Sequence, residues 1–184
     1  MKPNPIIKIV PVALLIAGVL TGCGKADPDP ATSVAAADRA IQPSTILLAE
    51  RPAETVSLAS ALETAANGSV VVVEGRVGGT LNPITEGFAA FVLADEAIWF
   101  CDEAEDDHCA TPWDACCENP DKVKALRVFV QFTDESGAPL QGDLLDQVGL
   151  APNQTVAVAG ELAIDAQGNR RIDASQLWIA PARL

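Results

Sequence analysis

Short β-type segments recur through the second half of the sequence and constrain the fold more than any other feature. Residues 70–77 form a β-branched run that changes into an alternating pattern, and apolar and polar residues alternate over residues 126–132. Further segments of this kind cover residues 88–95, 97–101, 156–164 and 170–179. Because short strands need several neighbours to bury an apolar face, the pattern predicts one small, mostly β domain.

The last two segments predict a hairpin with an irregular second strand. Residues 168–169 (Gly-Asn) lie between them in the position of a tight turn. In the final segment the apolar residues change parity between Ile172 and Leu177. A change of face within one strand requires an extra residue, so we expect a β-bulge near residues 175–176.

Two short stretches have helical character. Residues 57–67 carry apolar residues at helical spacing and end at Asn67-Gly68, which predicts one short helix packed on the strands. The pattern of residues 143–148 predicts a second short helix, with Asp143 as its N-terminal cap and Gly149 as the residue that ends it.

The order of these elements resembles that of small bacterial OB-fold domains. VVVEGRVGG (residues 71–79), FVLADEAIWF (91–100) and residues 155–179 look like the first, second and last strands of that fold. The resemblance covers about residues 56–180. It implies an OB-fold-like five-stranded barrel with one or two short helices and a Cys-rich loop insertion at residues 101–120.

The N-terminus has the features of an export signal. Lys2 and Lys8 give the chain a positively charged start. An apolar run follows from Ile9 to Leu20, which is too short to span a bilayer. Residues 20–23 (Leu-Thr-Gly-Cys) resemble the lipobox of bacterial lipoproteins, which implies cleavage before Cys23 and lipidation of that cysteine.

Three regions follow from this resemblance: a signal peptide (1–22), a lipidated cysteine with a flexible tether (23–55) and the barrel domain (56–184). The tether begins with Ala, Asp and Pro residues that cannot form a core. We expect a lipid-anchored protein of the bacterial cell envelope that faces the periplasm or the exterior. Gly24, where an inner-membrane retention signal would have Asp, favours the outer membrane.

The remaining cysteines all lie between residues 101 and 117, and export favours disulfide bonds between them. Cys116 and Cys117 are adjacent, so a bond between them would be strained. We therefore expect each to pair with either Cys101 or Cys109, in an order that the sequence leaves open. In extended backbone the two adjacent side chains point to opposite sides, which would staple the loop on both faces.

A soft-metal site is the alternative for the same stretch. Thiolate and imidazole ligands suit Zn²⁺ or Cu⁺, and the site would use Cys101, His108, Cys109, Cys116 and Cys117. The spacing lacks the paired C-x₂-C of many structural zinc sites, and without this site we expect no cofactor. A calcium site would need the carboxylates between residues 102 and 107, but they lack the glycine of an EF-hand loop.

The sequence contains no recognisable catalytic arrangement, so we expect a protein without enzymatic activity. The chain has one histidine, and no serine lies in a nucleophile-elbow pattern. Trp113 is a candidate for stacking on a ligand, although an aromatic plug that covers the disulfides is the commoner role for such a residue.

The charge of the chain restricts its partners. Removal of Lys2 and Lys8 with the signal leaves 10 basic residues against 25 acidic ones, a formal charge of −15. Such a protein repels phosphate backbones, and the basic residues near residues 122–127 and 170–171 are expected to be scattered. We therefore expect a binding or interaction module with an envelope protein or glycan as partner, rather than a nucleic acid, which an OB-fold could otherwise bind.

Overall fold

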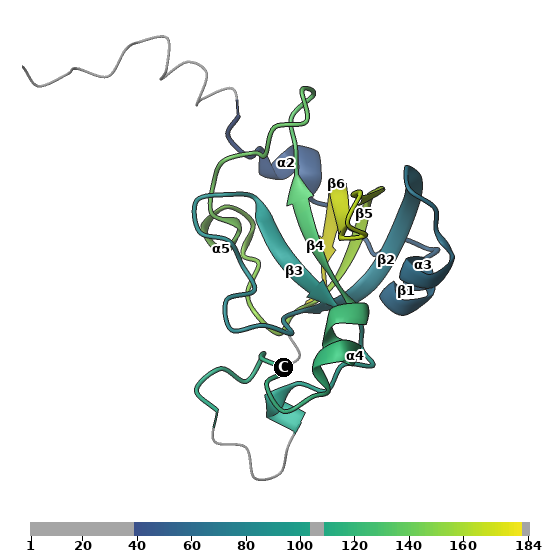
Figure 1. Cartoon of the computed structure of the whole chain (residues 1–184). Coiled ribbons are helices and arrows are strands. Elements are labelled where there is room, and N and C mark those ends of the chain that lie inside the picture. The colour runs from purple at the N-terminus through teal and green to yellow at the C-terminus, as the bar shows by residue number, and fades with distance from the viewer. Residues whose placement is uncertain (1–38, 104–108, 182–184) are drawn as a thin grey trace, which may run out of the picture.

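Five strands close into a barrel in the computed structural model, which describes residues 39–103 and 109–181 (Figure 1). In chain order they are β2 (Ser69–Val77), β3 (Ala90–Ala94), β4 (Arg127–Phe132), β5 (Thr155–Ile164) and β6 (Arg170–Ile179). They follow the order β2-β3-β4-β6-β5, and β2 pairs with β5 over eight residue pairs to close the sheet. The pair β4–β6 is parallel. This is the strand order of an OB-fold, so the predicted mostly β, five-stranded barrel is confirmed.

Short elements surround the barrel. The two-residue strand β1 (Val56–Ser57) pairs in parallel with β2. The described helices are α2 (Pro43–Ile46), α3 (Leu58–Thr64), α4 (Pro120–Ala125) and α5 (Leu144–Val148), so the structure has more helices than the one or two expected. None of these helices has the length and hydropathy needed to cross a membrane.

Local signals placed α3 and α5 correctly. The Ser57 side chain accepts a hydrogen bond from the backbone of Ser60 at the start of α3. Asp143 caps α5 in the same way through the N–H of Leu145, and Gly149 ends that helix in the left-handed conformation. These side chains satisfy backbone N–H groups that a helix start leaves without partners.

The predicted bulge in the last strand is confirmed. Ala159 pairs with Gln176 and Gly160 with Ala174, so Ser175 is the extra residue of β6. Gly160 lies against this bulge because the two strands approach closely. A Cβ atom at this position would lie 2.5 Å from the carbonyl oxygen of Asp173.

The strand expected over residues 97–101 is wrong. After β3 the chain turns, and the N–H of Ile98 donates to the carbonyl oxygen of Asp95. Ile98 and Phe100 are fully buried and Trp99 between them is exposed, which produces a strand-like alternation. They pack into a second apolar cluster outside the barrel instead of into a sheet.

Residues 40–48, which lie within the expected tether (23–55), contact the barrel, whereas most residues from 49 to 55 are exposed. Ile41 and Ile46 are buried in the main core. Ala40 forms a parallel bridge with Gln141, and Leu47 forms one with Leu177. This part of the chain therefore lies along the barrel before α3 begins. The signal peptide, Cys23 and the start of the expected tether lie outside the described residues.

Asp95 is the buried charged residue of the described chain, with 4% of its surface exposed. Its carboxylate accepts hydrogen bonds from the N–H of Ala59 in the first turn of α3, at 2.7 Å, and from the N–H of Ala97, at 2.9 Å. Its own N–H donates to the carbonyl oxygen of Leu126. Asp95 therefore joins α3, the end of β3 and the start of β4.

We expect Asp95→Asn to lower the free energy of unfolding by about 2 kcal/mol, because the amide leaves one of the two N–H donors to this buried side chain without an acceptor. Urea denaturation of the full chain measures this loss. The control is Glu96→Gln, since Glu96 is exposed and makes no hydrogen bond with the described residues; its effect should stay within about 0.5 kcal/mol. Equal losses in both variants would contradict the role of Asp95.

Candidate functional site

The described residues between β3 and β4, 96–103 and 109–126, are here called the flap and have an apolar cluster of their own. Ile98, Phe100, Ala115 and Val123 are buried together against the end of β3. Gly78, just after β2, allows this contact, because a Cβ atom there would lie 2.4 Å from the Phe100 ring. The flap, which includes α4, lies at the end of the barrel opposite α2 (Figure 1).

Polar contacts also attach the flap to the barrel. The guanidinium group of Arg76, in β2, lies over the Phe100 ring at 3.9 Å from the ring centre. Arg76 also donates to the carbonyl oxygen of Ile98 and forms an ion pair with Glu103. Trp113 is half-buried, and its indole N–H donates to the carbonyl oxygen of Leu81 at 3.0 Å. This position fits an aromatic plug, and stacking of Trp113 on a ligand stays a prediction.

The four cysteines that were expected to form disulfide bonds or a metal site lie together in the flap. The Sγ atom of Cys116 lies 3.4 Å from that of Cys101, 3.8 Å from that of Cys109 and 3.8 Å from that of Cys117. Cys101, Cys116 and Cys117 form a group whose sulfur atoms are all within 4.8 Å of one another. All four are thiols in this structure, so the expected disulfide pairing stays a prediction. Burial raises the pKa of the Cys101 thiol, and a hydrogen bond with Cys116 raises it further.

The expectation that Cys116 and Cys117 point to opposite sides is wrong. It assumed extended backbone, whereas the N–H of Glu118 donates to the carbonyl oxygen of Ala115 and closes a turn around the two cysteines. The turn brings their sulfur atoms onto the same side. His108, the remaining candidate ligand, lies outside the described residues.

The acidic residues next to the cysteines serve the structure. Asp102 accepts a hydrogen bond from the side chain of Asn153 at 2.6 Å, and Glu103 pairs with Arg76. The other carboxylates of the proposed calcium site, at residues 105–107, lie outside the described residues.

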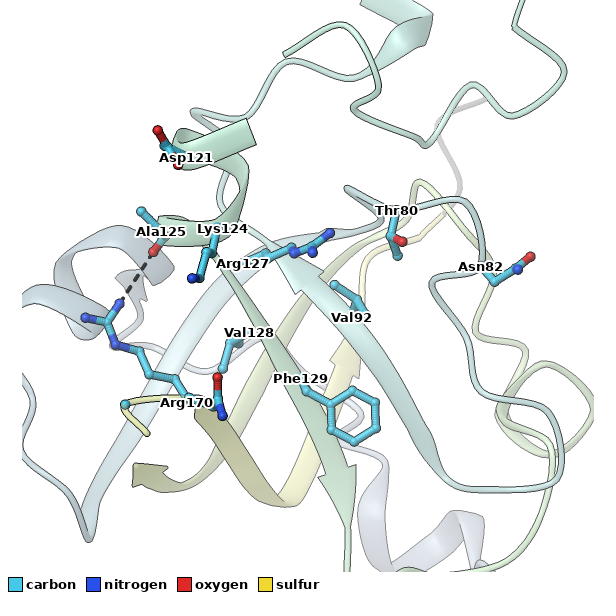
Figure 2. A pocket seen from close by; sticks show the side chains of 12 residues that line it. Thr80, Asn82, Val92, Asp121, Lys124, Ala125, Arg127, Val128, Phe129 and Arg170 are labelled. Carbon is cyan, nitrogen blue, oxygen red and sulfur yellow. Dashed lines mark hydrogen bonds between the residues drawn. The ribbon is translucent and has the colours of Figure 1, made fainter. Parts of the chain in front are cut away.

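A second site, which the sequence did not reveal, is a cleft of about 600 Å³ on the barrel face formed by β3 and β4. Its walls come from the loop after β2, from α4, from the start of β4 and from the turn between β5 and β6. Figure 2 shows the side chains of Lys124, Arg127 and Arg170 around one end of this cleft, with Phe129 further along β4. Phe129 is 38% exposed.

These three cations form no ion pair with an acid in the described part of the chain, although Asp121 lines the same cleft. Arg127 donates to the carbonyl oxygen of Gly79 at 2.9 Å, and Arg170 to that of Ala125 at 3.5 Å. Among the described residues, four other basic side chains do form ion pairs with acids: Arg51, Arg76, Lys122 and Arg171. The expectation of scattered basic residues is therefore wrong for Lys124, Arg127 and Arg170.

The strand order explains why these cations meet. Arg127 and Arg170 begin β4 and β6, which are parallel neighbours, so both side chains lie at the same edge of the sheet. An OB-fold has this parallel pair of strands, so the resemblance was enough to predict that Arg127 and Arg170 lie at the same edge of the sheet. Lys124 could not be placed from the sequence, because α4 itself was not predicted.

Comparison with protein-family profiles gives no match, and comparison with curated proteins gives none either. Among solved structures, the chain is similar to the hypothetical protein YgiW of Escherichia coli, with 14% identity over 76% of this chain and all of YgiW, and a TM-score of 0.36. It is also similar to the OBody AM1L10 bound to hen egg-white lysozyme, with 16% identity, 73% and 100% coverage, and a TM-score of 0.39.

A third similar structure is a putative aspartyl-tRNA synthetase from Leishmania major, with 10% identity and a TM-score of 0.43. That match covers 77% of this chain but only 24% of the synthetase. Identities and scores at this level carry no information on activity, and the OB-fold assignment rests on the strand order of the barrel itself.

Glu118 joins the flap to α4 and titrates at unusually low pH. Its carboxylate accepts hydrogen bonds from the Lys122 side chain and from the N–H groups of Asn119 and Trp99. The hydrogen bond from Lys122 is the largest of the causes that lower the Glu118 pKa from 4.5 to about 2. Because the Glu118 pKa is lower in the folded state, the ionised carboxylate stabilises the fold above pH 4.5. This stabilisation disappears as the pH falls toward 2 and the carboxylate is protonated.

We expect the Glu118→Gln variant to lose less stability than the wild-type protein between pH 4.5 and pH 2, because it lacks this titrating group. Urea denaturation of both proteins across this range measures the difference. A constant difference in stability at every pH would show that Glu118 has an ordinary pKa.

Proposed function

We propose that this protein is a lipid-anchored, non-catalytic binding module of the bacterial cell envelope that holds a short acidic oligosaccharide in the cleft on β3 and β4. The observation that carries the proposal is the meeting of Lys124, Arg127 and Arg170 in one cleft without acidic partners among the described residues. Like charges placed together repel one another, and an anionic ligand would remove this cost.

The composition of the cleft favours a sugar that carries carboxylate groups. Guanidinium groups bind carboxylates through charge-assisted hydrogen bonds, and Arg127 still has N–H donors beyond the one bonded to Gly79. Phe129 offers an exposed aromatic face on which a sugar ring can stack. Thr80 and Asn82 add neutral hydrogen-bonding groups for hydroxyls. The same face of other OB-folds binds oligosaccharides and oligonucleotides.

The acidic remainder of the chain limits the length of the ligand. A long polyanion would extend beyond the cleft onto a protein with a formal charge of −13 before any processing, and would be repelled there. A ligand of a few sugar units stays within the cleft, where three cations outnumber Asp121, the one acidic residue of its lining. This charge distribution supports a short acidic glycan over a nucleic acid.

The lipid anchor is the second part of the proposal, and it rests on the lipobox-like residues 20–23. We expect Cys23→Ser to move the protein from the membrane fraction to the soluble fraction, because two or more acyl chains give stable anchoring and none remains. Cell fractionation and the intact mass of the full chain measure this. A wild-type protein without lipid mass would contradict the anchor.

We expect Lys124→Ala and Arg127→Ala each to weaken binding of a short oligogalacturonide by about 10-fold to 100-fold, the value of one charge-assisted hydrogen bond. Calorimetric titration of the full chain in detergent measures the affinity, with a neutral oligosaccharide of equal length as the ligand control. Lys122→Ala is the matched variant, because Lys122 is on the same helix but is paired with Glu118.

The proposal predicts that Lys122→Ala changes the affinity by less than about 3-fold. It also predicts that the neutral oligosaccharide does not bind measurably. Equal affinity for the neutral and acidic ligands, or no binding of either, would contradict it.

A further inference from the structure

The arrangement of the four flap cysteines supports an inference that is independent of the cleft and its ligand. We propose that Cys101, Cys109, Cys116 and Cys117 form a tetrathiolate site for one soft divalent cation of the Zn²⁺ class. The four residues come from three places along the chain: the 3₁₀ turn at Cys101–Glu103, the segment at residue 109 and the turn before α4.

The distances between the sulfur atoms agree with a single central ion. In a tetrahedral zinc site the Zn–S bonds are about 2.3 Å long, which places neighbouring sulfur atoms about 3.8 Å apart. Cys116 lies at 3.8 Å from Cys109, at 3.8 Å from Cys117 and at 3.4 Å from Cys101. The sulfur atoms of Cys101, Cys116 and Cys117 all lie within 4.8 Å of one another, close enough for one ion to contact all three. Cys109 reaches this group through Cys116, and its sulfur atom has to move closer to the other two to complete a tetrahedral site.

Disulfide bonds fit this arrangement less well. Each sulfur atom forms one disulfide bond, so Cys116 would keep one of its three neighbours and the others would have to separate. The turn closed by the hydrogen bond from Glu118 to Ala115 also holds Cys116 and Cys117 on one side. Two separate disulfides would require different partners for these adjacent residues, whereas a metal ion accepts both.

The surroundings of the cluster match a structural site rather than a catalytic one. Cys101 is 4% exposed and packs with the apolar cluster of the flap, so one side of the site is closed. Four sulfur ligands complete the tetrahedral coordination of Zn²⁺ and leave no position for a substrate. Thiolates also select a soft cation over the Ca²⁺ or Mg²⁺ that the neighbouring carboxylates would otherwise attract.

Elemental analysis of the full chain, purified from membranes in mild detergent without chelators, tests the site. We expect about one zinc ion per chain and four thiols that react with an alkylating agent after denaturation without reductant. X-ray absorption at the zinc edge should show only sulfur neighbours, at about 2.3 Å. These measurements use the wild-type protein and do not depend on whether a variant folds.

Variants locate the site within the chain. Cys101→Ser and Cys116→Ser should each lower the zinc content of the purified protein at least about 10-fold, because serine replaces a thiolate ligand. Ala110→Ser is the matched control: it adds a serine next to Cys109, retains all four sulfur atoms and should retain the zinc.

Two results would overturn the proposal. One is a protein without zinc whose mass is lower by two hydrogens for each of two disulfide bonds, which would establish the oxidised form. The other is a zinc-free protein with four reduced thiols that does not take up added Zn²⁺. Neither result bears on oligosaccharide binding, so this site and the proposed cleft function can fail separately.

Discussion

Pairing between β2 and β5 is the constraint on which the rest of the structure depends. It joins residues 69–76 to residues 155–162, segments that are far apart in the sequence, and turns an open sheet into a barrel. Closure buries the main apolar core and fixes where each connection leaves the barrel. The loop after β2, α4 and the turn between β5 and β6 therefore lie around one cleft, although the residues that they contribute, at 80–82, 121–125 and 168–170, are far apart in the sequence.

The two candidate sites are connected through α4. This helix begins at Pro120, three residues after Cys117, and carries Lys124 into the cleft. A metal ion held by the flap cysteines, as proposed above, would therefore also limit the movement of the helix that carries a cleft cation. The flap has only a small apolar cluster of its own, so burial alone provides it with little stability.

Sequence patterns predicted the barrel, its helices α3 and α5 and the bulge at Ser175, because each depends on neighbours along the chain or on a strict alternation of faces. They were wrong where burial arose from a distant contact: Ile98 and Phe100 alternate like strand residues but pack under the flap. The cationic cleft depended on which strands are parallel neighbours, and the contact between the cysteines depended on an unpredicted turn. Both are tertiary features that residue spacing alone does not determine.

Mapping of amide chemical shifts by NMR during titration with a short oligogalacturonide tests whether the cleft binds an acidic glycan, because it locates the ligand on the barrel. We expect the largest changes at residues that line the cleft: Thr80, Lys124, Arg127, Phe129 and Arg170. Changes centred on the outer face of β5, or spread evenly over the acidic surface, would contradict it.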